Sequence, residues 1–554
     1  MKTSVALPWL LLASLALGPG AGAAGKPGKP GKPPMSPERR AAEQAAAVRD
    51  YLGRDMIFIS APGIESYLND IATKLLASQD AAPPVPKFLI QSTDEFSVFT
   101  DTRGNIVVGS EVLRQVESED ELAAAISHEL AHVIASHAET KNLVQKLPFT
   151  VETAQLVAVA VDSRGQKATA RPGEISKFAG DSLATTQAAG TIWSDLIAPG
   201  WNRQQEREAD LAGVDMVRAA GYDPAAFSSL FARIDAAQAV RSARVEALRQ
   251  DALKRAQAGT PAADASKGDA LVDSLKTGLQ TSAVEAAFTG LAGWGTDYDT
   301  PEQRTTAVLE HVQNTSTGRR DKTPRSPRFD AELRSGRHQQ LLDADRSALA
   351  MMAGMNSREP GSVRGVADAL LATPGAVELS PHLNLAIGTW QDTVQRKPAE
   401  AEQRAMAWSG TELAPRAAYL WRASYQIQKR DYQNAMSTLE TGAGRLGERS
   451  LFLPQMIAVA RGGGDLSRAD ELGMECSRTG TGLTLSNMAK LLEQTGNKVA
   501  SQPTGVYAEC VAALGYDPVQ RREQALKTQP AAGQKELSDF TRKLTDKLNK
   551  ALGK

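Results

Sequence analysis

The sequence predicts a mainly α-helical protein that contains one small β-sheet and ends in a helical repeat. Three observations support this fold class. Alanine is abundant while aromatic residues make up only 5% of the 554 residues, a composition that favours helix. Two short apolar runs are typical of strands, and similar segments recur at an offset of 34 residues near the C-terminus. At roughly 100–200 residues per domain, this length indicates about three domains.

Charge and cysteine content exclude several classes of protein. The 63 basic and 64 acidic side chains nearly cancel, which excludes a strongly basic nucleic-acid binder. The 2 cysteines are too few for a disulfide framework or for a cysteine-ligated zinc module. We therefore expect no nucleic-acid partner and no metal site built from cysteines.

The N-terminus is typical of an export signal. Lys2 precedes an apolar run over residues 5–17, and small residues at 21–23 offer a signal-peptidase site. Residues 1–24 are thus predicted to be a signal peptide, with a buried N-terminal helix as the alternative. Residues 25–37 are rich in Gly, Lys and Pro, which predicts a flexible linker. No later stretch supplies the ~20 consecutive apolar residues of a membrane helix, so we expect an exported protein without a transmembrane span.

A compact region with both helices and strands is predicted from about residue 38 to 235. Its first helix is indicated by apolar residues at helical spacing, namely Ile64, Leu68, Ile71 and Leu75. Prolines then end the helical pattern. Strands are predicted over residues 87–90 and 105–109, the second after the turn signal Arg103-Gly104.

The next helix begins with a capping box. Ser118 can accept hydrogen bonds from the first-turn amides while the side chain of Glu121 reaches back. Apolar residues follow at helical spacing, so a helix is predicted from Glu119 to about His137.

Two histidines on this helix are spaced to share a metal ion. His128 and His132 are four residues apart and therefore lie one above the other on the same face. Glu129 is rotated by about 100° from His128, so its carboxylate can hold a water molecule at the ion instead of ligating it. The pattern His-Glu-x-x-His is typical of zinc sites that activate water. The alternative is a helix with two packed or surface histidines.

A catalytic zinc needs a third protein ligand and one open position. No cysteine lies nearby, so a carboxylate or His137 must serve. His137 follows His132 by five residues and lies on a different part of the helix face. It also misses the six-residue offset of the metzincin pattern. We interpret His137 as a supporting or packed residue.

Glu206 and Asp210 form the best downstream pair of carboxylates. They open a second amphipathic helix, are four residues apart and share a face, so one can bind metal while the other accepts a hydrogen bond from a ligand histidine. Gly213 would permit close approach of the two helices, and Gly221 ends the second one. Glu208 points elsewhere and is expected to be solvated. The alternative for this run is a charged, exposed helix start.

These motifs resemble those of the HtpX and CAAX-prenyl-protease family of zinc metallopeptidases. They are His128-Glu129-x-x-His132, then Glu206-x-x-Ala209-Asp210, and finally Gly221-Tyr222-Asp223-Pro224. With an export signal and no membrane helix, the chain is most similar to the periplasmic BepA-type branch, the beta-barrel assembly-enhancing proteases. The resemblance covers roughly residues 40–235.

The resemblance implies a fold and a set of roles. Residues 38–235 would form a zincin-type metallopeptidase domain with one Zn²⁺ per chain. His128, His132 and Glu206 would ligate the zinc, Glu129 would be the general base, and Asp210 would orient a ligand from outside the coordination sphere.

One feature of that branch is missing. The resemblance implies a histidine before a proline that caps the zinc and holds the enzyme latent, but Thr300 and Thr323 stand at the two corresponding segments. Threonine is a poor zinc ligand, so this latch is expected to be absent or supplied from elsewhere. His311 and His338 are the candidate substitutes, and the alternative is that both are simply solvated.

The rest of the chain is predicted to be helical. Residues 236–340 are interpreted as a helical insertion and regulatory linker. Residues 341–545 are interpreted as a repeat domain, because Ala401, Ala435 and Ala469 recur at the 34-residue period of tetratricopeptide (TPR) repeats. A plain helical bundle is the alternative. Cys476 and Cys510 are also 34 residues apart, and the sequence leaves open whether they are bonded.

These features predict a periplasmic zinc endopeptidase whose TPR-like repeats recruit polypeptide substrates. The resemblance suggests quality control of outer-membrane proteins, with their assembly machinery as a partner. The strand at 105–109 is expected to hold an extended peptide along its edge. One alternative is a chaperone or scaffold whose zinc site is silent or latent. Another is a repeat adaptor without metal.

Overall fold

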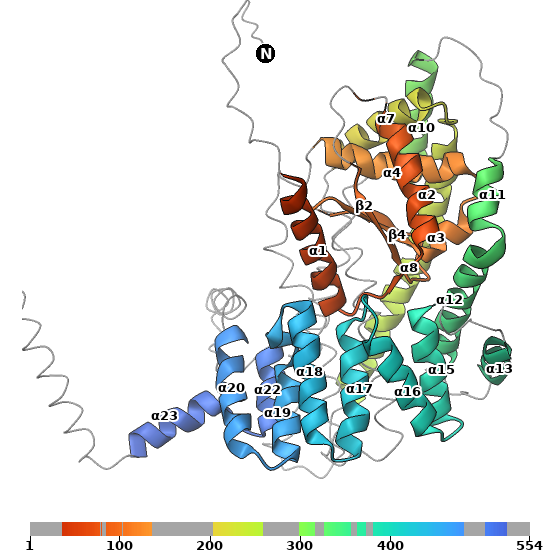
Figure 1. Cartoon of the computed structure of the whole chain (residues 1–554). Helices are drawn as coiled ribbons and strands as arrows, with labels where there is room; N and C mark the ends of the chain where they lie inside the picture. Colours follow the sequence, from red (N-terminus) through yellow and green to blue (C-terminus); the bar gives the residue numbers. More distant parts are fainter. Residues whose placement is uncertain are drawn as a thin grey trace, which may run out of the picture.

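The fold of the chain is seen in a computed structural model (Figure 1). The predicted signal peptide, most of the predicted linker, His137 and Thr323 lie outside the residues that it describes. The described residues are 36–77, 79, 85–101, 103–135, 203–258, 299–315, 326–355, 363–372, 380–480 and 505–528.

The structure is mainly helical with one small sheet, which confirms the predicted fold class. Among the described residues the sheet has four strands in the order β1-β2-β4-β3, with β2 and β4 parallel and both outer pairings antiparallel. The two predicted strands are present. The sequence analysis missed the other two, because segments of two and three residues are too short to show a strand period. The strands are β1 (Phe58–Ile59), β2 (Lys87–Gln91), β3 (Val98–Thr100) and β4 (Asn105–Gly109).

The expectation that residues 105–109 offer a free edge is wrong. This segment is β4, which is paired along its length with β2 on one side and with β3 on the other. Its backbone groups are therefore already used. The strand at that end of the sheet is β3.

Both faces of the sheet are buried, in two different cores. Side chains on one face of the sheet, such as Phe88, Ile106 and Val108, lie in a core with helices α2, α4, α7 and α8. Side chains on the other face, including Leu89, Phe99 and Val107, lie in a core with α1 and the C-terminal helices. This explains why β2 and β4 are nearly continuous apolar runs. Figure 1 shows the sheet between these two groups of helices.

The first group of helices covers the face of the sheet that carries the candidate site. The predicted helix near residue 68 is α2, with all four of its predicted apolar residues buried. Helix α7 packs on α4, and α8 and α10 pack on these two. The helices up to this point in the chain are α1 (Pro37–Gly53), α2 (Pro62–Leu76), α3 (Ser110–Gln115), α4 (Glu119–Ile134), α7 (Arg203–Ala219), α8 (Ala226–Ala258) and α10 (Pro301–Thr315).

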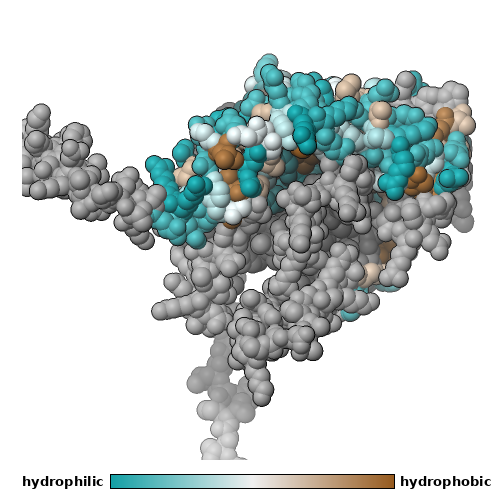
Figure 2. All heavy atoms as spheres, turned by 90° about the horizontal axis from the view of Figure 1, so that it is seen from below, coloured by the Kyte–Doolittle hydropathy of each residue, from teal (hydrophilic) through white to brown (hydrophobic). Residues whose placement is uncertain are grey.

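The C-terminal helices form a layer in which most of them pack against their neighbours in the chain (Figure 1). Seen from below, the exposed side chains of this layer are mostly hydrophilic (Figure 2). The helices are α11 (Pro327–Leu333), α12 (Gly336–Met355), α13 (Arg364–Ala372), α15 (Pro381–Thr393), α16 (Pro398–Ser409), α17 (Arg416–Gln428), α18 (Tyr432–Leu446), η5 (Arg449–Phe452), α19 (Leu453–Gly462), α20 (Leu466–Gly480), α22 (Gly505–Leu514) and α23 (Pro518–Thr528). None of the helices in the described ranges is long and apolar enough to cross a membrane.

A period of 34 residues is visible in this layer. Ala401, Ala435 and Ala469 are all buried and occupy the fourth position of α16, α18 and α20. The backbone repeats as well, since the residues that precede these helices have positive φ at the same spacing: Arg396 (59°), Arg430 (59°) and Gly464 (84°). The structural period agrees with the predicted one, while the assignment to the TPR family stays a prediction.

A disulfide bond joins α20 to α22. Cys476 and Cys510 are bonded, with a Cα–Cα distance of 6.6 Å. We expect the double substitution Cys476→Ala/Cys510→Ala to destabilise the helical layer by about 2–4 kcal/mol. The reason is that the bond joins residues 34 positions apart and so restricts the unfolded chain. Urea unfolding followed by the helical circular dichroism signal measures the change. Reduced wild type is the control and should unfold like the variant; an unchanged midpoint in both would contradict the prediction.

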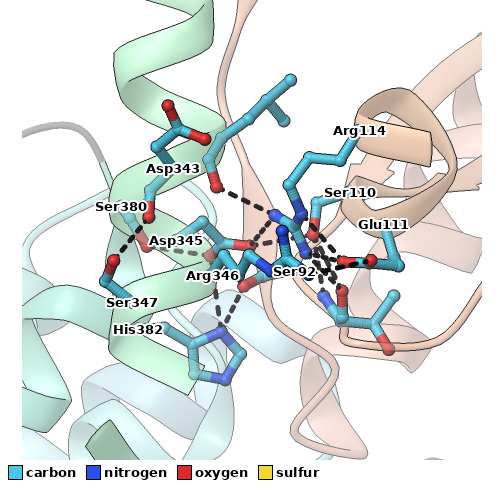
Figure 3. A network of polar contacts seen from close by, with 12 residues as sticks. Ser92, Ser110, Glu111, Arg114, Asp343, Asp345, Arg346, Ser347, Ser380 and His382 are labelled. Atoms are coloured by element: carbon cyan, nitrogen blue, oxygen red, sulfur yellow. Dashed lines mark hydrogen bonds and ion pairs between the residues drawn. The ribbon is translucent and has the colours of Figure 1, made fainter. Parts of the chain in front are cut away.

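A buried polar network joins the sheet to the C-terminal layer (Figure 3). At its centre is Asp345 of α12, which is fully buried. Three serine hydroxyls donate hydrogen bonds to its carboxylate: Ser92 at the end of β2, Ser110 at the start of α3 (2.8 Å) and Ser380 at the N-cap of α15 (3.0 Å). Burial opposes ionisation of Asp345, but contacts with His382 and these hydroxyls hold its pKa below the ordinary value.

An arginine and a histidine complete this network. Arg114 of α3 lies 3.8 Å from the Asp345 carboxylate and donates a hydrogen bond of 2.8 Å to the carbonyl of Leu342. Its guanidinium also bonds Glu111. His382 of α15 contacts Ser92 through Nδ1. Residues from β2, α3, α12 and α15 therefore depend on one buried carboxylate.

Candidate metal centre

Helix α4 brings two imidazole rings together. Its capping box forms as predicted, since the amide of Glu121 donates to Ser118 Oγ (3.1 Å) and the Glu121 carboxylate reaches back to the amide of Glu117 (2.8 Å). His128 and His132 lie with ring centroids 4.8 Å apart, and their Nε2 atoms are separated by 3.2 Å. The four-residue spacing on a helix produces this arrangement.

Helix α7 passes close to α4 because of a glycine. A Cβ atom on Gly213 would lie 3.1 Å from Ser127 Oγ and 3.2 Å from the backbone nitrogen of His128. Any larger residue would push the helices apart. Gly221 has φ of +84° and ends the helical turn after α7, as the sequence predicts.

The close approach places Glu206 opposite both histidines. Its two carboxylate oxygens lie 3.4 Å from His128 Nε2 and 3.5 Å from His132 Nε2. In a tetrahedral zinc site with bonds of about 2.0–2.1 Å, neighbouring ligand atoms are separated by about 3.3 Å. Among the described residues, these three side chains form a group that could hold a metal ion. Their ligand atoms all lie within 4.8 Å of one another. Their geometry therefore fits a zinc ion.

The charges of these groups favour a bound cation. Burial opposes protonation of His128, but contacts with Asp210 and Glu206 raise its pKa to about 10. Burial likewise opposes ionisation of Glu206, yet the two histidines and Arg304 hold its pKa below the ordinary value. The protein environment thus stabilises positive charge between these side chains.

Glu129 is adjacent to this group and is not one of its ligands. Its side chain is 6% exposed, and Oε2 has no hydrogen-bond partner in the protein. Burial raises the pKa of Glu129 to about 7. A buried carboxylate oxygen without a partner is rare, and a water molecule held at the centre would satisfy it.

Asp210 lies on the other side of His128. Its Oδ1 is 2.9 Å from Nδ1 of His128, the ring nitrogen that does not face Glu206. A contact of this kind fixes the orientation of a ligand imidazole. The structure therefore places Asp210 where the sequence analysis expected an orienting carboxylate.

Arg304 of α10 also contacts the centre, and the sequence analysis missed it. It pairs with Asp210, 94 residues earlier in the chain, through two hydrogen bonds of 2.7 and 2.8 Å. A single arginine in a helix shows no local pattern that would connect it to a motif so far away. A second arginine, Arg207, pairs with Asp299 just before α10, and its side chain is largely exposed.

Other residues singled out in the sequence lie elsewhere. Glu208 is exposed, as predicted, and accepts a hydrogen bond from Gln204. Thr300 caps α10 by accepting a hydrogen bond of 3.3 Å from the amide of Gln303. His311 pairs with Asp215 and is not part of the metal group.

His338 is not part of the metal group either. Its Nδ1 contacts Glu332, and its ring packs on Gly63 at the start of α2. The two candidate substitutes for a latch histidine are therefore both engaged away from the centre.

Comparison with known proteins identifies the family of this region. The profile of peptidase family M48 matches residues 63–276, a range that contains the two histidines, Glu129, Glu206 and Asp210. The chain carries a peptidase family M48 domain. The match agrees with the resemblance seen in the motifs. The matched range of the M48 domain ends before α10 and the C-terminal layer, so it does not test the TPR assignment.

Several curated proteins are similar to the chain. It is 26% identical over 176 residues to the Beta-barrel assembly-enhancing protease of Escherichia coli (strain K12), which covers 32% of this chain and 34% of that protein. The protein of the same name from Yersinia pestis is 25% identical over 196 residues, 35% of this chain and 38% of its own length. The Mitochondrial metalloendopeptidase OMA1 of Schizosaccharomyces pombe is 30% identical over 135 residues, 24% of this chain and 33% of its own length. The similarity spans about a third of the length of each relative.

Proposed function

We propose that this protein is a zinc-dependent endopeptidase that hydrolyses peptide bonds in unfolded or misassembled proteins. The observation that carries the proposal is the convergence of His128, His132 and Glu206 on one point, with ligand atoms within 4.8 Å of one another. The buried Oε2 atom of Glu129 beside them, which has no hydrogen-bond partner in the protein, supports it further.

His128, His132 and Glu206 would hold one zinc ion per chain. A zinc ion at such a site lowers the pKa of a bound water towards neutrality and polarises a carbonyl group. Glu129 accepts a proton from the attacking water and later delivers it to the nitrogen of the leaving amine. Asp210 keeps His128 oriented throughout.

The peptide substrate is proposed to bind along β3 and not along β4. Strand β3 is last in the order of the sheet and packs against α4, the helix that carries the histidines. The backbone of Thr100, in the same strand, acts to lower the pKa of Glu129, which places this edge beside the candidate base. A peptide can pair with a strand edge only when it is extended, so the substrate segment must be unfolded or locally opened.

We propose that the protein acts in the periplasm, because residues 1–24 are predicted to be an export signal and the motifs resemble those of the periplasmic BepA-type branch. Because relatives of the chain are called beta-barrel assembly-enhancing proteases, we propose that the protein acts in outer-membrane protein quality control. The C-terminal layer, with its period of 34 residues, would act as a TPR-like surface for polypeptides or for the assembly machinery.

Metal removal tests the proposed activity. The mature chain should bind one zinc ion and cleave a labelled unfolded protein such as casein. A chelator should abolish cleavage, and added zinc should restore it, because Glu129 alone cannot activate water sufficiently. Zinc content by atomic spectroscopy and fragment analysis by electrophoresis measure both outcomes.

Three other outcomes would reject the proposal. Cleavage that persists after complete zinc removal excludes a zinc enzyme. Stoichiometric zinc without cleavage favours the chaperone or scaffold. A chain that binds no zinc favours an adaptor built on the repeats.

A further inference from the structure

Helix α10 places a buried cation against the carboxylates of the metal centre. The side chain of Arg304 is only 13% exposed. Its guanidinium also lies 4.5 Å from the ring centroid of Phe231 on α8. Arg304 is thus held by α7 through Asp210 and by α8 through an aromatic ring, which leaves the guanidinium little freedom.

The contacts of Arg304 form a chain that ends at a metal ligand. Nη2 is 2.7 Å from Asp210 Oδ1, and the same oxygen is 2.9 Å from His128 Nδ1. Nε bonds the second oxygen of Asp210 at 2.8 Å. Two parallel bonds fix the plane of a carboxylate, which a single contact does not. The plane of the Asp210 carboxylate in turn sets the position of the imidazole.

Charge balance also requires this arginine. Glu129, Glu206 and Asp210 are all at least partly buried and would bring three negative charges when ionised. A divalent ion between neutral histidines supplies two positive charges, and Arg304, 3.5 Å from Glu206, supplies the third. Without Arg304 the buried centre would keep one uncompensated negative charge, which is costly in a site of low dielectric.

We propose that Arg304 is a positioning residue of the metal centre, which holds Asp210 against His128 and so keeps His128 oriented to bind zinc. The inference rests on the proposed zinc site but not on peptide hydrolysis. Arg304 lies beyond residues 63–276, so a part of the chain outside the family match completes the centre. Docking of α10 is then a condition for a fully formed site.

A double-mutant cycle in the full chain tests this role. The variants are Arg304→Gln, Asp210→Asn and the two combined, with zinc affinity measured by competition with a chromogenic chelator. Arg304→Gln should weaken zinc binding about tenfold or more, the usual effect of losing an outer partner of a ligand. The double variant should bind zinc no more weakly than Asp210→Asn alone, since Arg304 acts through Asp210.

Two further variants distinguish an effect of Arg304 on the position of Asp210 from an effect on the stability of the whole fold. Arg304→Lys keeps the charge without the two parallel bonds and should recover part of the lost affinity. Arg233→Gln is the matched control, because Arg233 is similarly buried, at 22% exposure, and pairs with Glu121 of α4 away from the ligands. This control should bind zinc like the wild type even if its melting temperature falls.

Three results of the double-mutant cycle and its control would contradict the proposed role of Arg304. Wild-type zinc affinity in Arg304→Gln, fully additive effects with Asp210→Asn, or an equal loss in Arg233→Gln would each overturn the proposal. These readouts concern zinc and not proteolysis. A chain that binds zinc but cleaves nothing would refute the proposed activity and still leave the cycle decisive for Arg304.

Discussion

Glu129→Gln should retain one zinc ion per chain and lose peptide hydrolysis by about 10²- to 10⁴-fold. Glutamine has nearly the same shape as glutamate, so the ligands on either side of it in α4 keep their positions. It cannot accept a proton from water, and the carboxylate that it replaces is buried beside the ligand group with one oxygen, Oε2, that has no hydrogen-bond partner. Initial rates of cleavage of an unfolded protein, with zinc content measured on the same samples, provide the test.

A matched control is available on the neighbouring helix. Glu208 lies on α7, two residues from Glu206, but its side chain is exposed. Glu208→Gln removes the same charge and should cleave like the wild type. Comparable cleavage by Glu129→Gln and Glu208→Gln would remove Glu129 from the role of general base.

Asp345→Ala should destabilise the folded chain by about 3–5 kcal/mol, the usual cost of removing one partner from a buried ion pair. The carboxylate is fully buried and accepts hydrogen bonds from three serines, so its loss removes one acceptor from each hydroxyl and the negative charge that lies 3.8 Å from the guanidinium of Arg114 (Figure 3). Equilibrium urea unfolding followed by circular dichroism measures the loss.

The same helix supplies the control for this prediction. Asp343 is two residues away in α12 and is exposed. Asp343→Ala should change stability by no more than about 0.5 kcal/mol, as surface substitutions usually do. If both variants unfold at the same urea concentration, the network does not stabilise the contact between the sheet and the C-terminal layer.

The parts of the site that depend on local spacing could be predicted. The four-residue intervals between His128 and His132 and between Glu206 and Asp210 each define one face of one helix. The glycine at 213 indicated a close contact between helices, and the structure has it. These inferences succeeded because helix periodicity and capping act over a few residues.

Short segments and distant contacts could not be predicted. Strand β3 has three residues, so no pattern distinguished it, and the free edge was assigned to β4 instead. Arg304 lacks any local signal for its contact with Asp210. Asp345 and His382 likewise show no pattern in the sequence that distinguishes them from other helix residues, although both contact Ser92 in a buried cluster.

The sequence by itself determined which helices carry the candidate metal ligands, which face of each helix they occupy, and the 34-residue period of the C-terminal layer. Only the tertiary structure decided that Glu206 meets the two histidines, that β3 is the outer strand, and that Arg304 pairs with Asp210 beside the candidate centre. The physical reason is the range of the forces involved. Backbone hydrogen bonds and side-chain spacing within a helix are set by neighbours in the chain, whereas the pairing of residues 94 or 290 positions apart is set by how whole elements pack.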